Sequence, residues 1–197
     1  VMWMAAGFTM LEAGLVRKKN TAEIVTKNIG LYSIACTMFL VCGYQALYAS
    51  GGNGFMPAFT FDWMNAEPGA TVIEGYEDDG TPYAANASDF FFQVVFVATA
   101  VSIVSGAVAE RIKLGAFMLY AFLLLVFVYP IVGSWQWGGG FFSTFTEEVG
   151  FYDFAGSTLV HSVGGWGALV VIYFLGARKG KFDSDGNPQA IPGSNIP

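Results

Sequence analysis

The sequence predicts an all-α integral membrane protein with five transmembrane helices. Hydrophobic residues make up 54% of the 197 residues and charged residues only 12%, whereas soluble domains carry about 25% charged residues. The apolar residues form long runs, most of them close to the ~20 residues that cross the hydrocarbon core of a bilayer. Because a backbone inside lipid must satisfy its own hydrogen bonds, runs of this kind fold as helices.

Five apolar runs define the expected helices, and each ends at a basic or glycine-rich segment. They cover about 1–16, 28–50, 89–109, 114–135 and 153–175. A polar, acidic exterior loop is expected between the second and third runs, over 51–88. The first run is too short to span a bilayer by itself, and the sequence stops inside a polar stretch. We therefore expect a fragment that lacks the start of its first helix and everything after its fifth.

The basic residues predict the orientation of these helices. All nine are assigned to the connections after the first, third and fifth runs: Arg17, Lys18, Lys19, Lys27, Arg111, Lys113, Arg178, Lys179 and Lys181. The other two connections contain none, which is the positive-inside pattern. We expect a multi-pass protein of the inner (plasma) membrane with its N-terminus outside. A soluble bundle is disfavoured, because a chain of this size has too little polar surface to hide four nearly uncharged helices.

Ionisable residues inside a membrane helix are costly and need a reason, at about 2.5–3.5 kcal/mol each in the centre of a helix. Glu12 lies about one turn inside the basic end of the first run, and we expect it to pair with Arg17 or Lys18, or to be interfacial. Glu110 adjoins Arg111 at a helix boundary, where an ion pair between these neighbours is the natural expectation. Both carboxylates are thus interpreted as structural.

His161 is the single histidine of the chain and lies eight residues into the fifth run. On the residues alone, a hydrogen bond to a neighbouring helix and a place in a pore are about equally plausible for it. An imidazole can both donate and accept, so it also suits a pore that handles a protonatable solute. Asp153 opens the same run and is expected first as an N-cap, and second as a charge that stabilises a cation from below.

Aromatic and small residues mark the remaining features of the runs. Phe92 and Phe96 are four residues apart and share one helix face, while Trp137 follows the fourth run. On spacing alone, packing and an interfacial aromatic belt are favoured over a cage for a small cation. Glycine and serine in the third and fifth runs are typical of close helix packing. We find no nucleotide-binding loop, nucleophile–base pair or metal-ligand cluster in the sequence, so no cofactor, metal or nucleic acid is expected.

Four segments in order resemble the ammonium transporters of the Amt/Rh superfamily, on the Amt side. The strongest is Asp153-Phe-Ala-Gly-Ser-Thr-Leu-Val-His161, followed by Gly164-Gly165 and ending at Gly176-Ala-Arg178. The supporting segments are Gly14 to Asn20, Gly106 to Arg111 and Trp137 to Gly140. The resemblance extends over nearly the whole chain except the exterior loop around 67–87.

This resemblance implies the first half of an eleven-helix, inverted-repeat fold, so that 1–197 is a partial ammonium transporter domain within a homotrimer. It implies that His161 is the first of two pore histidines and that Asp153 lies beneath an outer recruitment site. It assigns Trp137 to that site and Phe92 and Phe96 to a stacked gate. The second histidine and a recruitment-site serine would lie outside this chain.

The expected function is passage of ammonium or ammonia through a narrow apolar pore lined by His161. The main alternative is the ammonium sensor module of a fused signalling protein, and a structural subunit without substrate is a further one. A membrane enzyme is the least favoured class, because no nucleophile constellation is present. The resemblance also implies a PII-type regulator in some members, which the basic connections neither show nor exclude.

Overall fold

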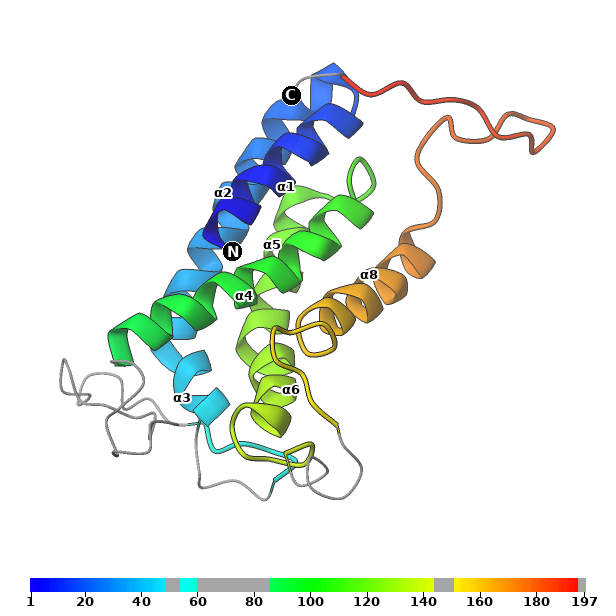
Figure 1. Ribbon diagram of the computed structural model, residues 1–197. Helices are drawn as coiled ribbons and strands as arrows, with labels where there is room; N and C mark the ends of the chain where they lie inside the picture. Colours follow the sequence, from blue (N-terminus) through cyan, green and yellow to red (C-terminus); the bar gives the residue numbers. More distant parts are fainter. Residues whose placement is uncertain (49–53, 60–85, 144–150, 195–197) are drawn as a thin grey trace.

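In the computed structural model of the chain, residues 1–48, 54–59, 86–143 and 151–194 are described, so most of the expected exterior loop lies outside them. Within these ranges the chain is a bundle of helices (Figure 1). The helices are α1 (Met2–Leu15), α2 (Thr21–Met38), α3 (Tyr44–Tyr48), α4 (Asn86–Ala107), α5 (Leu114–Leu123), α6 (Tyr129–Gln136) and α8 (His161–Leu175). The described residues contain no strand, and one isolated bridge joins Phe182 to Pro188.

Two long rods arise because short π-helical segments join α-helices without a break. Phe39–Gly43 joins α2 to α3, and Leu124–Val128 joins α5 to α6. Pro130 lies at the start of α6, directly after the second π-helical segment. Since proline has no N–H to donate to the preceding turn, a widened turn at this point is consistent with the missing bond.

Three helical rods are long and apolar enough to cross a membrane, namely Lys18–Tyr48, Ala87–Ala107 and Leu114–Gln136. Helix α8 is apolar but has only 15 residues, and α1 has 14. At 1.5 Å per residue, helices of this length fall short of the ~30 Å of a bilayer core. The predicted all-α, multi-pass character therefore agrees with the structure, with three rods of spanning length among the described residues.

Two of the expected helix starts are wrong, and they change the positions of Lys27 and His161. The second helix begins at Thr21, so Lys27 lies inside α2 with no exposed surface instead of in a connection. The fifth helix begins at His161, and residues 157–160 form a turn before it. Hydropathy placed the first boundary too late because one charged side chain inside a helix interrupts an apolar run.

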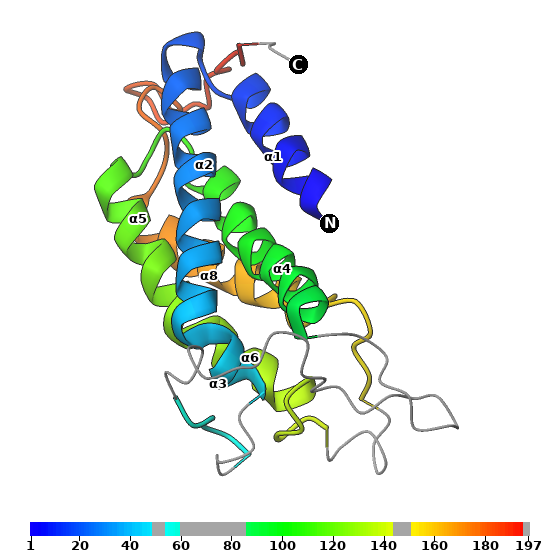
Figure 2. The ribbon, with the colours of Figure 1, turned by 90° about the vertical axis from the view of Figure 1, so that its left-hand side faces the viewer.

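Helix α4 lies at the centre of the bundle and packs against α1, α2 and α8 (Figures 1 and 2). Three of its valines, Val97, Val101 and Val104, have no exposed surface and belong to the apolar core. In contrast, Trp3 of α1 and Tyr173 of α8 are 80% and 81% exposed. Large exposed apolar side chains on the outer helices fit a surface that faces lipid or further protein.

Close contact between α4 and α8 depends on glycine, as the small residues predict. A Cβ on Gly164 would lie 2.7 Å from the carbonyl oxygen of Ala100, and one on Gly167 would lie 2.4 Å from the Tyr120 hydroxyl. A Cβ on Gly165 would meet nothing within 4 Å. Within α8, the close approach of the α4 backbone thus requires glycine at position 164 but not at position 165.

Glu110 ties three connections together at one end of the bundle. Its carboxylate lies 3.1 Å from the Arg17 guanidinium and 3.7 Å from that of Arg178, and the Asn20 amide donates to it at 2.6 Å. The expected ion pair with Arg111 is wrong, since Arg111 donates instead to the carbonyls of Gly176 and Ala107. Glu110 has a φ of 61° in the turn after α4, and neighbouring side chains there do not face each other.

Candidate functional site

Three aromatic rings gather where the N-terminal half of α4 meets the segment after α6. The ring centroids of Phe92 and Phe96 are 5.0 Å apart, and those of Phe96 and Trp137 are 6.2 Å apart. Phe92 is 55% exposed whereas Phe96 is 9% exposed. The helical spacing places the two phenylalanines one turn apart, but only the tertiary fold adds the tryptophan. The group can offer ring faces to a small cation.

Asp153 organises the turn that precedes α8. Its Oδ1 accepts the backbone N–H groups of Gly156 and Ser157 at 2.7 and 3.0 Å. Its Oδ2 accepts those of Thr158 and Leu159, both at 2.8 Å. The side chain does cap backbone N–H groups, but it caps this turn and not the first turn of the helix, because α8 begins only at His161. Four backbone N–H groups thus converge on one carboxylate, and together they fix the path of the turn.

The same turn contacts Trp137 directly. The indole N–H of Trp137 donates to the backbone carbonyl of Asp153 at 3.1 Å. Gly156 has a φ of 84°, and a Cβ there would lie 2.3 Å from a methyl carbon of Val160 and 3.4 Å from the Trp137 ring. Glycine at this position therefore permits both the left-handed turn and the close approach of the indole.

His161 is the first residue of α8, and its side chain is exposed. Its Nδ1 lies 3.2 Å from the carbonyl oxygen of Gly156. Because a carbonyl can only accept, Nδ1 carries the hydrogen in this contact. A continuous series of contacts thus runs from Phe92 through Phe96 and Trp137 to the turn that supports His161.

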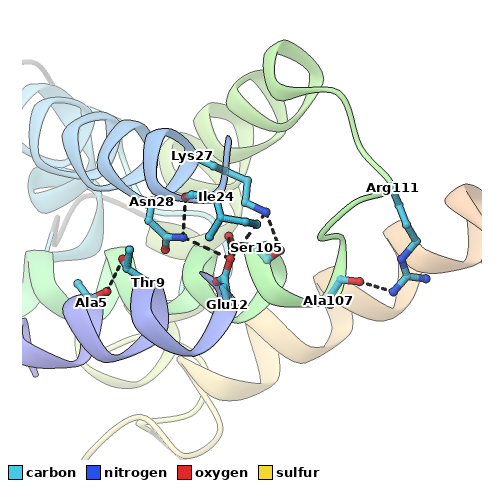
Figure 3. Close-up of polar contacts among 9 residues, drawn as sticks. All are labelled: Ala5, Thr9, Glu12, Ile24, Lys27, Asn28, Ser105, Ala107 and Arg111. Atoms are coloured by element: carbon cyan, nitrogen blue, oxygen red, sulfur yellow. Dashed lines mark hydrogen bonds and ion pairs between the residues drawn. The ribbon is translucent and has the colours of Figure 1, made fainter. Parts of the chain in front are cut away.

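A buried polar cluster that the sequence did not predict lies between α1, α2 and α4 (Figure 3). Glu12 does not pair with Arg17 or Lys18, as expected, but lies 3.7 Å from Nζ of Lys27. The hydroxyl of Ser105 and the amide of Asn28 also donate to the Glu12 carboxylate, at 2.8 and 3.2 Å. Glu12 and Lys27, two opposite charges within apolar helices, were the sequence signal for this cluster. It was missed because the expected start of the second helix was too late and assigned Lys27 to a loop.

The described residues contain no group of three or more histidine, cysteine, aspartate or glutamate side chains that could hold a metal ion. The chemistry available at the aromatic group and the adjoining turn is therefore that of π faces, one imidazole and a backbone turn polarised by Asp153. These groups can attract a small cation and exchange hydrogen bonds with a small amine.

Comparison with known proteins identifies the family to which the chain is similar. The sequence model of the Ammonium Transporter Family matches residues 1–197. The chain is 40% identical to ammonium transporter Amt2 of Archaeoglobus fulgidus over 203 residues, which cover 100% of this chain and 40% of that protein. It is 36% identical to Amt2 of Haloferax mediterranei, again over 100% of this chain and 40% of the relative.

Among solved structures, one described as a sensor Amt protein superposes with a TM-score of 0.77 at 31% identity. The superposition covers 96% of this chain and 44% of that one. The chain thus spans about two fifths of the length of the curated relatives given above. With a family match over every residue and this agreement in fold, the chain belongs to the Ammonium Transporter Family.

Proposed function

We propose that this chain is the first half of a membrane transporter that passes ammonium nitrogen through an apolar pore lined by His161. The observation that carries the proposal is the direct connection of the aromatic group to the histidine. Trp137 donates to the Asp153 carbonyl, and the Asp153 carboxylate organises the turn whose Gly156 carbonyl contacts His161. A cation held at the rings is thereby adjacent to a turn that ends in a proton-exchanging side chain.

The same helices and basic connections support a proposal for the membrane topology and assembly of the protein. The five proposed crossing segments are α1, the rod of α2 and α3, α4, the rod of α5 and α6, and α8 with the turn before it. Together they form one half of an eleven-helix inverted repeat. Arg17, Glu110 and Arg178 bring three basic connections to one end of the bundle, which supports a cytoplasmic face there and an exterior N-terminus in the inner (plasma) membrane. A homotrimer and a PII-type regulator at that face complete the proposal.

The proposed mechanism separates the proton from the nitrogen. A bare cation in hydrocarbon costs on the order of 20 kcal/mol by idealised Born solvation, and ring faces contribute only about 0.5–2 kcal/mol each. Phe96 and Trp137 therefore collect the cation at the mouth, where the indole is hydrogen-bonded to the turn that contains Asp153. The nitrogen then crosses as neutral ammonia beside His161 while the proton moves separately. Potassium has no proton to give up and is excluded. This is transport and not enzymatic chemistry.

The test uses the full-length protein in liposomes on a solid-supported membrane, with ammonium and potassium pulses compared. His161→Ala should lose the ammonium current or its selectivity over potassium. Gly165→Ala is the matched control on the same helix, because its new methyl group meets nothing within 4 Å, and it should conduct like wild type. A normal ammonium-specific current in His161→Ala would refute the proposed role of the histidine.

A second candidate function is an ammonium sensor, and the superposition on a sensor Amt protein favours keeping it. In that case the same aromatic group and histidine bind ammonium but drive a signalling domain with little net transport. Saturable ammonium binding without any current in the full-length protein would move this function to first place. A robust current that is specific for ammonium would remove it.

A further inference from the structure

Among the described residues, the cluster between α1, α2 and α4 is a deeply buried set of polar side chains outside the proposed pore. Glu12 and Asn28 are 3% and 5% exposed, and Lys27 and Ser105 are completely buried. Figure 3 shows Glu12 of α1 at the middle of the group, with Lys27 and Asn28 reaching it from α2 and Ser105 from α4. Nothing in the proposed transport mechanism uses these residues.

The surroundings of the Lys27 ammonium group are those of a binding site for an amine. Its Nζ donates to the backbone carbonyl of Ser105 at 3.0 Å and lies 3.7 Å from Oε2 of Glu12. The ring centroid of Phe117, on α5, is 5.3 Å from the same nitrogen. A carboxylate, a carbonyl oxygen and an aromatic face together are the groups that recognise a primary ammonium ion.

The Glu12 carboxylate depends on this single cation. Its Oε2 receives the donors of Ser105 and Asn28 as well as the charge of Lys27, whereas its Oε1 is buried and accepts no hydrogen bond. Among the described residues Lys27 is its one ionic partner, and the other two donors are neutral. A buried carboxylate without a cation is strongly unfavourable, so removal of Lys27 creates a demand for another cation.

We propose that Glu12, Ser105 and Phe117 form an alkylammonium site that the chain fills with its own Lys27. Lys27 then acts as a tethered ligand that neutralises Glu12 and keeps the site closed to free ammonium ions. The claim that Lys27 excludes a transported ammonium ion rests on the proposed function. The claim that the site binds an amine after the Lys27 side chain is truncated does not. The site lies between helices distant in sequence, since Ser105 and Glu12 are 93 residues apart.

Truncation of Lys27 makes the site testable by chemical rescue. Lys27→Ala removes Cγ, Cδ, Cε and Nζ, which are the four heavy atoms of propylammonium, and leaves the space for them. Lys27→Met retains much of the volume but no charge, so it leaves Glu12 unpaired with no room for an amine. Lys27→Ala combined with Glu12→Gln keeps the space but removes the carboxylate that would bind the cation.

The experiment measures the midpoint of thermal unfolding of the full-length protein in detergent, with propylammonium chloride exchanged for sodium chloride at constant ionic strength. The midpoint of Lys27→Ala should rise with propylammonium and then saturate, as for a ligand that binds the native state alone. Wild type, Lys27→Met and the Lys27→Ala/Glu12→Gln double variant should show no such saturable rise. A flat response in folded Lys27→Ala, or an equal rise in the double variant, overturns the proposal.

A second comparison covers the case in which Lys27→Ala does not fold. Lys27→Met should then have a lower unfolding midpoint than Lys27→Met/Glu12→Gln, because only the single variant buries an unpaired charge. Equal midpoints would show that Glu12 requires no cation and would overturn the proposal. Neither comparison measures transport, so a failure of the transport function leaves both results interpretable.

Discussion

Replacement of Asp153 by asparagine is the sharpest test of how the turn before α8 is built. The carboxylate accepts four backbone N–H groups, two on each oxygen. An amide of the same shape has only one oxygen. The NH2 group replaces the second carboxylate oxygen, so it points its own hydrogens at two backbone N–H groups that need an acceptor. Rotation of the amide does not help, since either orientation leaves two N–H groups without a partner.

The expected loss follows from these four bonds. A hydrogen bond to a charged group contributes about 1.5–3 kcal/mol to stability, so two lost bonds would cost about 3–6 kcal/mol. Residues Ser157 and Thr158 are exposed, and water can replace part of the lost bonding there. We therefore expect Asp153→Asn to lower the free energy of unfolding by about 3 kcal/mol, at the lower end of the range for two such bonds.

The assay is unfolding of the full-length protein in mixed micelles by increasing sodium dodecyl sulfate, followed by tryptophan fluorescence. Asp185→Asn is the matched control, because Asp185 is exposed and surface changes of this kind usually stay within about 0.5 kcal/mol. If Asp153→Asn differs from wild type by no more than this control, the carboxylate does not hold the turn, and its proposed support of Trp137 and His161 fails with it.

Three further predictions concern the packing, the charged end and the aromatic group. Gly164→Ala should cost about 1–3 kcal/mol in the same unfolding assay because its Cβ meets α4, whereas Gly165→Ala should cost nothing; equal effects would contradict the contact. Burial raises the pKa of Glu110. Hydrogen bonds from Arg17 and from the side-chain amide of Asn20, together with the charge of Arg17, outweigh burial and bring this pKa below its ordinary value of 4.5. A lowered pKa stabilises the fold above pH 4.5 and loses that effect as pH falls through the lowered value. The difference in stability between wild type and Glu110→Gln should thus be constant above pH 4.5 and should shrink as the pH falls through the lowered pKa of Glu110. A difference that does not change with pH would argue against the ion pair. Trp137→Phe keeps a ring but loses the indole N–H that donates to the Asp153 carbonyl. The ammonium concentration that gives half-maximal current should therefore rise. An unchanged value would show that this hydrogen bond does not contribute to cation binding at the rings.

Much of the architecture is present in the local sequence. Runs of apolar residues at 89–109 and 114–135 predict helices whose observed bounds differ by only a few residues. The four-residue spacing of Phe92 and Phe96 predicts that they share a face, and their rings are in contact. Each of these inferences depends on residues within one or two helical turns, where geometry is fixed by the backbone itself.

The partners of charged groups were decided only by the tertiary structure. Glu12 was expected to pair with a cation five or six residues ahead, but pairs with Lys27 of α2, and Glu110 pairs with Arg17, 93 residues away. Likewise, nothing local placed the indole of Trp137 on the carbonyl of Asp153. Hydropathy reports the cost of moving each residue into lipid, one residue at a time. Which opposite charge or donor offsets that cost depends on how the helices pack, and packing is a property of the whole chain.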